Sequence, residues 1–252
     1  MKLVVDVGNS RIKWAFSDEG VLHDVVECKL PMRRYDSFLK KQWGSLQVPE
    51  SVIVSNVAKA DMMVEIERWV TENWSVPTQS VVAEEKGWGV CNVYRAPERL
   101  GADRWAGMIA ARRISQRRAC CIIDCGTAIT IDAISDNGQH QGGLILPGIT
   151  LMRDALCKKT VGVKLDEEPC TDASLSLLAR ETTGAVTGGT LYAAVASIDR
   201  IMADVRAELG GRIVCIITGG DAPVILPLLS GNYEYKKDLV LDGLAQIAQA
   251  KK

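Results

Sequence analysis

The chain of 252 residues lacks the features that mark several large classes of protein. Its 30 basic and 31 acidic side chains give a formal net charge of −1, whereas proteins that bind nucleic acids usually carry a clustered basic excess. No apolar run reaches the ~18 residues that cross a membrane. No signal peptide precedes the first apolar segment either. We therefore expect a cytoplasmic protein whose partners are neither nucleic acids nor membranes.

The chain is also poor in the ligands of a structural zinc site. It has only two histidines, His23 and His140, and none of its eight cysteines form a Cys-x-x-Cys pair. Cys120, Cys121 and Cys215 lie inside apolar runs, where a thiol behaves as a small hydrophobic side chain. We therefore expect reduced cysteines, as in the cytosol, and no structural zinc.

Two widespread nucleotide-binding motifs are missing as well. The chain contains no Gly-x-x-x-x-Gly-Lys-Ser/Thr loop and no Gly-x-Gly-x-x-Gly segment, which excludes a P-loop or a Rossmann interpretation. The densest basic stretch, Arg112–Arg118, follows a helical pattern. We interpret it as a solvated helix end whose cations complement the helix dipole, and not as a nucleic-acid contact.

What the sequence does contain is an α/β pattern that occurs twice. In the first half it predicts strands at Leu3–Val7, Arg11–Phe16, Val21–Cys28 and Ser51–Asn56, and helices at Asp61–Trp74 and Ala102–Ile114. In the second half it predicts strands at Ile129–Ile134 and Ile213–Thr218, and helices at Ala185–Leu209 and Leu241–Ala250. The apolar stripe of the first predicted helix is interpreted as core: Met62, Met63, Ile66, Trp69 and Val70.

The clearest sign of the repeat is a short motif. Val4–Ser10 and Ile122–Ala128 share two β-branched residues, an aspartate, any residue, a glycine and two small or polar residues. The two aspartates, Asp6 and Asp124, stand 118 residues apart, close to half the chain. A repeat of this period predicts two similar α/β domains, and we divide them into residues 1–117 and 118–252.

Each copy of the motif suits the binding of a polyphosphate. The glycine lets the turn tighten and expose backbone N–H groups, and the aspartate can hold Mg²⁺ directly or through water. A third glycine-rich turn, Thr218–Asp221, follows a buried strand and could let adenine lie against the backbone. Equally, Asp221 and Pro223 could simply begin a helix.

These features together resemble the superfamily of acetate and sugar kinases, heat-shock ATPases and actin. Asp6–Lys13 and Asp124–Thr130 look like its two phosphate loops, and Thr218–Asp221 looks like its adenosine loop. The resemblance implies an α/β fold of two similar actin-like (ribonuclease H-like) domains, in which mixed sheets are flanked by helices.

Three further segments narrow the resemblance to type III pantothenate kinases. Tyr94–Trp105, with its Leu-Gly-Ala-Asp-Arg core, Gly142–Ile149 and Thr182–Val186 match segments of that family in the same order. The resemblance covers essentially the whole chain. It implies that the protein uses ATP to phosphorylate pantothenate to 4'-phosphopantothenate, the first step of coenzyme A biosynthesis.

The resemblance also implies roles for individual residues. Asp103 is similar to the catalytic base, Asp124 to the ligand of a monovalent cation, potassium or ammonium, and Asp6 would hold Mg²⁺ through the phosphates. The implied substrate-binding residues are Tyr94, Gly101, Ala102, Asp103, Arg104 and Thr182. The implied ATP-binding residues are Asp6, Val7, Gly8, Asn9, Ser10, Arg11, Ile12, Lys13 and Thr127. The family further implies a homodimer whose pantothenate pocket is completed across the interface by Thr182, or by its neighbour Thr183.

Other interpretations of these residues stay open. Asp103 follows Gly101 at the start of a helical pattern, so it could be only a favourable charge at a helix N-terminus. The protein could be a kinase for another small alcohol, or a regulatory accessory protein of the same fold, since some members were described as Bvg accessory factors. The sequence does not decide whether Asp132 contributes to the site.

Overall fold

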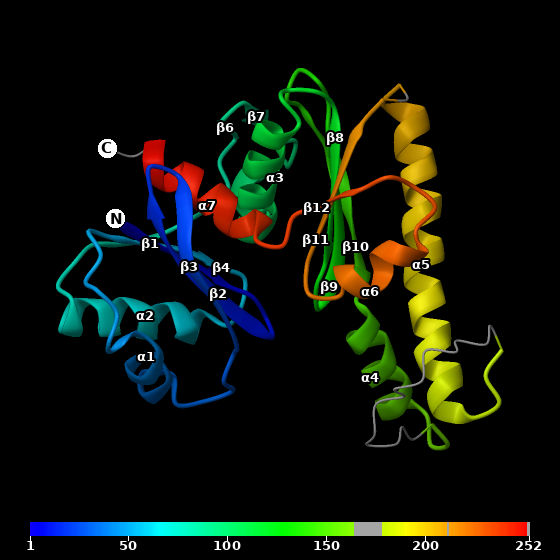
Figure 1. The fold of residues 1–252 in the computed structure, drawn as a ribbon, viewed down its shortest axis with the longest axis horizontal. Coiled ribbons are helices and arrows are strands. Elements are labelled where there is room, and N and C mark those ends of the chain that lie inside the picture. The colour runs from blue at the N-terminus through cyan, green and yellow to red at the C-terminus, as the bar shows by residue number, and fades with distance from the viewer. Residues whose placement is uncertain (164–177, 211, 251–252) are drawn as a thin grey trace. The chain divides into compact units, whose positions relative to one another are not determined.

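The structure is a computed structural model that describes residues 1–163, 178–210 and 212–250 (Figure 1). Cys170 lies outside the described residues. Among the described helices, none combines the length and the apolar character needed to cross a membrane.

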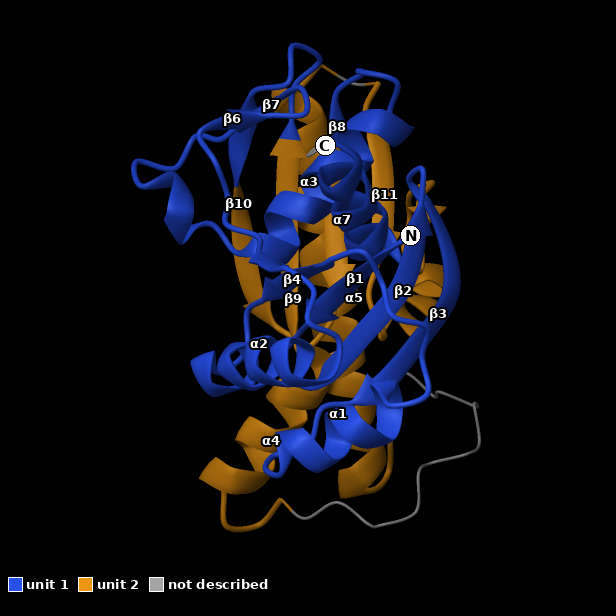
Figure 2. Cartoon of the chain, turned by 90° about the vertical axis from the view of Figure 1, so that its left-hand side faces the viewer, with its two compact units in different colours: residues 1–120, 134–142, 238–252 blue, residues 121–133, 143–237 orange. Residues whose placement is uncertain are grey.

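The chain divides into two compact units. The first unit comprises Met1–Cys120, Ile134–Gly142 and Asp238–Lys252, and the second comprises Cys121–Ala133 and Gly143–Lys237 (Figure 2). Each unit is built on a mixed sheet, and each is described below by itself.

The sheet of the first unit has the strand order β3-β2-β1-β4-β5. The central strand β1 pairs antiparallel with β2 and parallel with β4. Its Leu3–Val5 segment is completely buried, as expected for a strand that is covered on both faces of its sheet. The strands are β1 (Lys2–Val7), β2 (Arg11–Asp18), β3 (Val21–Lys29), β4 (Val52–Asn56) and β5 (Thr78–Ser80).

One face of this sheet is covered by α1 (Tyr35–Trp43) and α2 (Ala60–Asn73) (Figure 1). The predicted stripe of α2 is confirmed, because its members Met62, Ile66, Trp69 and Val70 are buried, with Met63 packed beside them. Four tryptophan rings join the helices to the sheet at centroid distances of 4.8 to 6.0 Å: Trp14, Trp43, Trp69 and Trp74. The sequence patterns did not predict α1.

The other helices of the first unit are α3 (Ala102–Ile114) and α7 (Leu239–Ala250). They pack against each other so closely that Gly243 lies directly against the backbone of Ala106. The last helix of the chain therefore groups with the first unit, because its contacts are with α3 and β1. The compact units thus differ from the linear division at residue 117 that the repeat suggested.

A turn from the middle of the chain also belongs to the first unit. Arg112 of α3 donates hydrogen bonds to the carbonyl oxygens of Asp136, at 2.6 Å, and of Ser135, at 3.4 Å. Arg112 is buried, with only 6% of its surface exposed. The interpretation of Arg112–Arg118 as a solvated helix end is therefore wrong for its first residue, because Arg112 is buried and its Nη1 and Nη2 donate to these carbonyls. Arg113, Arg117 and Arg118 are exposed, as predicted.

The sheet of the second unit has the order β10-β9-β8-β11-β12, the same order as in the first unit with each strand replaced by its counterpart. The predicted repeat is thereby confirmed at the level of the sheets. The strands are β8 (Cys120–Cys125), β9 (Ala128–Ile134), β10 (His140–Pro147), β11 (Val214–Thr218) and β12 (Glu234–Tyr235). β9 and β10 extend across the boundary between the compact units.

The helices of the second unit are α4 (Ile149–Lys159), α5 (Thr182–Glu208) and the short α6 (Ala222–Ile225). Leu191, Val195 and Ile198 of α5 face the core as predicted, but Tyr192 is 43% exposed, so α5 is not buried on all sides. Short elements complete the fold: β6 (Lys86–Gly87), β7 (Val90–Cys91) and the 3-10 helices η1 (Pro97–Arg99) and η2 (Leu226–Leu228). The predicted apolar cysteines Cys120, Cys121 and Cys215 are buried.

Candidate functional site

The turn between β1 and β2 carries the predicted ATP-binding residues of the first unit. The N–H of Gly8 donates to the carbonyl of Arg11 at 3.0 Å and closes the turn. Asp6 and Lys13 face each other as a cross-strand pair. Asn9, Ser10 and Arg11 are exposed, whereas the side chains of Val7 and Ile12 are buried in the core. Val7 and Ile12 can therefore offer a ligand only their backbone.

Lys13 is held between two carboxylates. Its ammonium lies 3.7 Å from Glu27 of β3 and 3.6 Å from Asp238, which immediately precedes α7. Arg11 at the exposed end of the turn donates to the same Glu27 at 2.6 Å. These ion pairs orient both cations of the turn. Glu27 and Asp238 were not predicted, since no sequence pattern relates them to residue 13.

The start of α3 lies at the same edge of the sheet as this turn. The N–H of Val57, just after β4, donates to the carbonyl of Val7 at 3.0 Å. A Cβ atom placed on Gly101 would lie 3.7 Å from the Val57 side chain. Because β1 and β4 are parallel, their carboxyl ends meet at one edge, and the first turn of α3 lies beside that edge. The predicted base and the predicted phosphate turn therefore belong to one region of the first unit.

The carboxylate of Asp103 folds back over the beginning of α3. Its Oδ1 accepts a hydrogen bond of 2.7 Å from the backbone N–H of Arg104. A Cβ atom on Gly101 would come within 2.5 Å of this oxygen, so glycine leaves the space that the carboxylate uses. The positive end of the helix dipole favours the ionised carboxylate at this position. Asp103 is half-buried, so its carboxylate has a fixed orientation and can still be reached by a substrate.

Tyr94 and Arg104 form a contacting pair. Nη1 of Arg104 donates to the phenol oxygen of Tyr94 at 2.9 Å, and its Cζ lies 5.7 Å from the centre of the tyrosine ring. Asn92 fixes the backbone there, since its Oδ1 accepts from the N–H of Tyr94 at 3.0 Å. The structure thus brings together the predicted substrate-binding residues Tyr94 and Arg104. Ala102, another predicted substrate-binding residue, is buried.

In the second unit the glycine-rich turn after β11 lies against the end of β8. Gly219 has a φ of +96°, and a Cβ atom on it would overlap the peptide of Cys125 and lie 2.5 Å from Oδ1 of Asp124. The N–H of Asp221 donates to the carbonyl of Cys125 at 2.9 Å. Asp124 is therefore bordered by backbone on two sides, which is the surrounding expected of an oxygen ligand to a hard cation.

Thr127 belongs to the same turn region of the second unit. Its side chain is exposed, and its carbonyl oxygen accepts a hydrogen bond of 3.0 Å from the N–H of Gly148, the residue before α4. The second predicted phosphate turn is thus tied to the start of a helix, where backbone N–H groups favour anions. Gly148, which makes this hydrogen bond, belongs to the segment Gly142–Ile149 that resembles the family.

The thiol of Cys125 lies below this turn. Burial raises the pKa of Cys125 above its usual range, and the carboxylates of Asp124 and Asp221 raise it further. The thiol therefore stays protonated at neutral pH.

Thr182 lies elsewhere in the second unit. It is the first residue of α5, and the side chain of the preceding Glu181 accepts hydrogen bonds from the N–H groups of Thr183, at 2.8 Å, and Gly184, at 2.5 Å. Figure 1 shows the beginning of α5 beside the end of α4, away from the end of α4 that follows Gly148. Thr182 is exposed, and the structure does not bring it next to Thr127 or Asp124.

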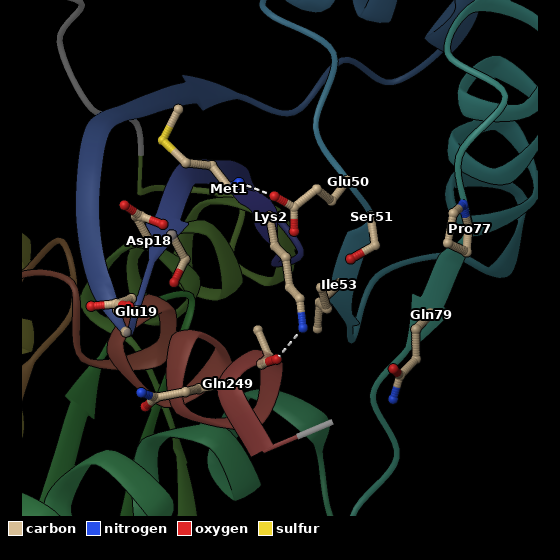
Figure 3. Close-up of a pocket in the computed structure, with 13 residues that line it drawn as sticks. Met1, Lys2, Asp18, Glu19, Glu50, Ser51, Ile53, Pro77, Gln79 and Gln249 are labelled. Carbon is tan, nitrogen blue, oxygen red and sulfur yellow. Dashed lines mark hydrogen bonds and ion pairs between the residues drawn. The ribbon is translucent and has the colours of Figure 1, made fainter. Parts of the chain in front are cut away.

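A pocket of about 600 Å³ lies at the opposite end of β1 from the phosphate turn (Figure 3). In it the amino group of Met1 donates to Glu50 at 2.6 Å, and Lys2 donates to the carbonyl of Ala248 at 2.5 Å. None of the 13 residues that line this pocket is a predicted site residue. The pocket is therefore separate from the candidate site.

Solved structures share this fold. The chain aligns with the crystal structure of a conserved Baf family transcriptional activator from Campylobacter jejuni at a TM-score of 0.61, with 22% identity over 98% of each chain. It aligns with an inorganic polyphosphate/ATP-glucomannokinase from Arthrobacter at a TM-score of 0.50, with 13% identity over 99% of this chain and 98% of the other. The fold, with its two Asp-x-Gly turns, thus defines an α/β protein of the actin-like class to which sugar kinases belong.

Sequence comparison identifies the family within this class. The profile described as type III pantothenate kinase matches residues 2–204. A type III pantothenate kinase from Nitrosococcus oceani is 42% identical over 253 residues, which cover 99% of this chain and 94% of that protein. The chain belongs to the type III pantothenate kinase family, and it is therefore a phosphotransferase of coenzyme A biosynthesis.

The contact between Gly219 and β8 generates a prediction about stability. Gly219→Ala must place a Cβ atom at positive φ and against the Cys125 peptide, so we expect a loss of about 1–3 kcal/mol in the free energy of unfolding. Gly220→Ala is the matched control, because a Cβ atom there meets nothing within 4 Å. Urea unfolding measures both variants. Equal stability of the two would show that the turn does not approach β8 as described.

Proposed function

We propose that this chain transfers the γ-phosphoryl group of ATP to the primary hydroxyl group of pantothenate, with Asp103 as the general base. The observation that most supports this proposal is the common edge in the first unit. There Val57 links the turn at Gly8–Arg11 to the first turn of α3. Its N–H donates to the carbonyl of Val7, just before the turn, and its side chain lies beside Gly101, just before α3. A base and a phosphate-binding turn at one edge are what in-line phosphoryl transfer needs.

In this mechanism Asp103 orients the acceptor hydroxyl and takes its proton. The hydrogen bond from the N–H of Arg104 holds one oxygen of this carboxylate in place. The guanidinium of Arg104 would pair with the carboxylate of pantothenate. Tyr94 accepts from Arg104 and limits how that guanidinium can turn.

A triphosphate with its Mg²⁺ fits the turn of the first unit. The turn offers exposed Asn9 and Ser10, and the carboxylate of Asp6 and the ammonium of Lys13 stand on paired strand positions. Asp6 would hold the metal, and Lys13 would face a phosphate oxygen. When bound, Mg²⁺ neutralises the charge of the phosphates and so lowers the barrier to attack. In the second unit, Thr127 is the proposed ATP contact, and its side chain is exposed.

A monovalent cation, potassium or ammonium, is proposed at Asp124. The carboxylate stands beside Gly219 and 3.6 Å from a Cβ atom placed on Gly126, and the carbonyls of residues 125–127 are close by. Carboxylate and carbonyl oxygens suit such cations. The protonated thiol of Cys125 does not add a negative charge there.

We further propose that the active unit is a homodimer whose pantothenate pocket is completed by Thr182 of the partner subunit. Large apolar side chains of the second unit are exposed on three of its elements: Leu144 and Ile145 on β10, Leu151 on α4 and Tyr192 on α5. Such exposure suits a partner surface. In a symmetric dimer each subunit would complete the other's pocket.

The cytoplasm is the proposed location. Cys28, Cys91, Cys125, Cys157 and Cys215 have free thiols, and reduced thiols are typical of the cytosol.

The role of Asp103 is tested by Asp103→Asn. If Asp103 is the base, the variant keeps its fold and its KM values, while kcat falls by about 10²–10⁴-fold. Asp61→Asn is the control, because Asp61 also lies in the first turn of a helix, α2. A coupled assay of ADP release measures both. If the two substitutions had the same small effect on kcat, Asp103 would be a helix charge only.

The cation site predicts a requirement for potassium or ammonium. Activity should fall strongly in buffers that contain only sodium or Tris and should return when potassium is added. Asp124→Asn should lose this response, whereas Asp154→Asn, an exposed aspartate of α4 paired with Lys158, should keep it. Initial rates over a series of potassium concentrations give the comparison. Full wild-type activity without either cation would reject the site.

The dimer is tested by mixing inactive chains. Asp103→Asn and Thr182→Val subunits, unfolded and refolded together, should regain about a quarter of the wild-type sites, because half of randomly formed dimers are mixed and each holds one intact site. Thr183→Val in place of Thr182→Val identifies which threonine matters. If mixed dimers form without any regain of activity, Thr182 does not complete the partner's pocket.

A further inference from the structure

The aromatic ring of Tyr94 has a second neighbour besides Arg104. The imidazole of His140 stacks on it, with ring centroids 6.0 Å apart and planes inclined by only 16°. His140 has no exposed surface. Tyr94 therefore has the guanidinium of Arg104 on its hydroxyl side and a buried flat ring against its face. Stacked pairs at this separation contribute about 0.5–1.5 kcal/mol beyond the area that they bury.

His140 reaches Tyr94 because the turn before it is anchored in the first unit. Besides the bonds from Arg112 to the turn carbonyls, the N–H of Cys91 donates to the carbonyl of Gly138 at 2.9 Å. The amide of Gln139 reaches back to the carbonyl of Cys91 at 3.4 Å. Residues 135–139 are thus fixed from two directions, and His140 follows as the first residue of β10. The hydrogen bonds of residues 135–139 therefore help to fix the position of the His140 imidazole.

We propose that His140 is a positioning residue for pantothenate binding, which acts by holding the ring of Tyr94. This inference rests on the proposed function, in which Tyr94 and Arg104 contact the substrate. The phenol oxygen that receives the Arg104 hydrogen bond keeps its place only if the ring does not swing about the Cα–Cβ bond, and the stacked imidazole packs against the ring on one face. With the face of the ring packed on His140, the phenol and the guanidinium keep one arrangement before the substrate arrives. Pre-arranged groups lose less entropy on binding, so the stack favours affinity for the acceptor.

His140 therefore affects the binding of the acceptor, and not the binding of ATP or the phosphoryl transfer itself. His140 contacts Tyr94, whereas the turn at Gly8–Arg11 and the carboxylate of Asp103 are oriented by other residues, among them Glu27 and the N–H of Arg104. Loss of the stack should therefore change the KM for pantothenate and leave kcat and the KM for ATP nearly unchanged. A purely structural role would change all three together or only the stability.

The test compares His140→Ala with His140→Phe. Alanine removes the ring, so the KM for pantothenate should rise about 3–10-fold, as the free energy of a stacked pair implies, with kcat and the KM for ATP within about 2-fold of wild type. Phenylalanine restores a flat ring and should bring the KM for pantothenate back to within about 2-fold. A folded alanine variant with an unchanged KM would overturn the proposal. So would a phenylalanine variant as impaired as alanine.

A double-mutant cycle with Tyr94→Leu separates this inference from the proposed function. In thermal unfolding, the effects of His140→Ala and Tyr94→Leu should be non-additive, because the residues are in contact; this readout needs no activity. In kinetics, His140→Ala should raise the KM for pantothenate no further once Tyr94 is replaced. Wild-type protein that does not phosphorylate pantothenate would overturn the proposed function and this inference with it. Additive effects on KM, with normal wild-type turnover, would overturn this inference alone.

Discussion

The rest of the site depends on how β1, the central strand of the first sheet, pairs with its two neighbours. β1 has an antiparallel neighbour on one side and a parallel neighbour on the other. The antiparallel pairing places a tight turn at its carboxyl end, and the parallel pairing brings the end of β4 to the same edge. Residues that follow either strand are therefore neighbours, however far apart they are in sequence. The turn at Gly8–Arg11 and Val57 share an edge for this reason, and Val57 lies beside Gly101 at the start of α3.

The second unit repeats the strand order of the first, but the surroundings of its turns differ. There the turn after β11 lies against the end of β8, with Gly219 close enough to contact the Cys125 peptide and the Asp124 carboxylate. The equivalent aspartates consequently have different surroundings. Asp6 faces Lys13 across a strand pair, whereas Asp124 is bordered by backbone. The metal proposed at Asp6 and the monovalent cation proposed at Asp124 would therefore have different surroundings.

Local patterns predicted much of the fold but little of the acceptor side of the site. The strand at Leu3–Val7 and the helix at Ala102–Ile114 follow from their own residues, and the Asp-x-Gly repeat pointed to both turns. Asp103 had a local explanation as a helix charge, and only the family resemblance favoured catalysis. The burial of Arg112 could not be foreseen, because two of its acceptors, the carbonyls of Ser135 and Asp136, lie more than 20 residues away in sequence. His140 also carries no local signal, since its stack on Tyr94 depends on that distant anchor.

Mass spectrometry of pantothenate incubated with the protein, ATP, Mg²⁺ and potassium tests the central claim most directly. The account predicts that pantothenate gains one phosphoryl group, in step with the formation of ADP, and that other small alcohols under the same conditions remain largely unmodified. Consumption of ATP with pantothenate left unchanged and another acceptor phosphorylated would contradict the assignment of the substrate. No ATP consumption with any acceptor, from folded protein, would contradict the proposal that the edge of the first unit is a catalytic site.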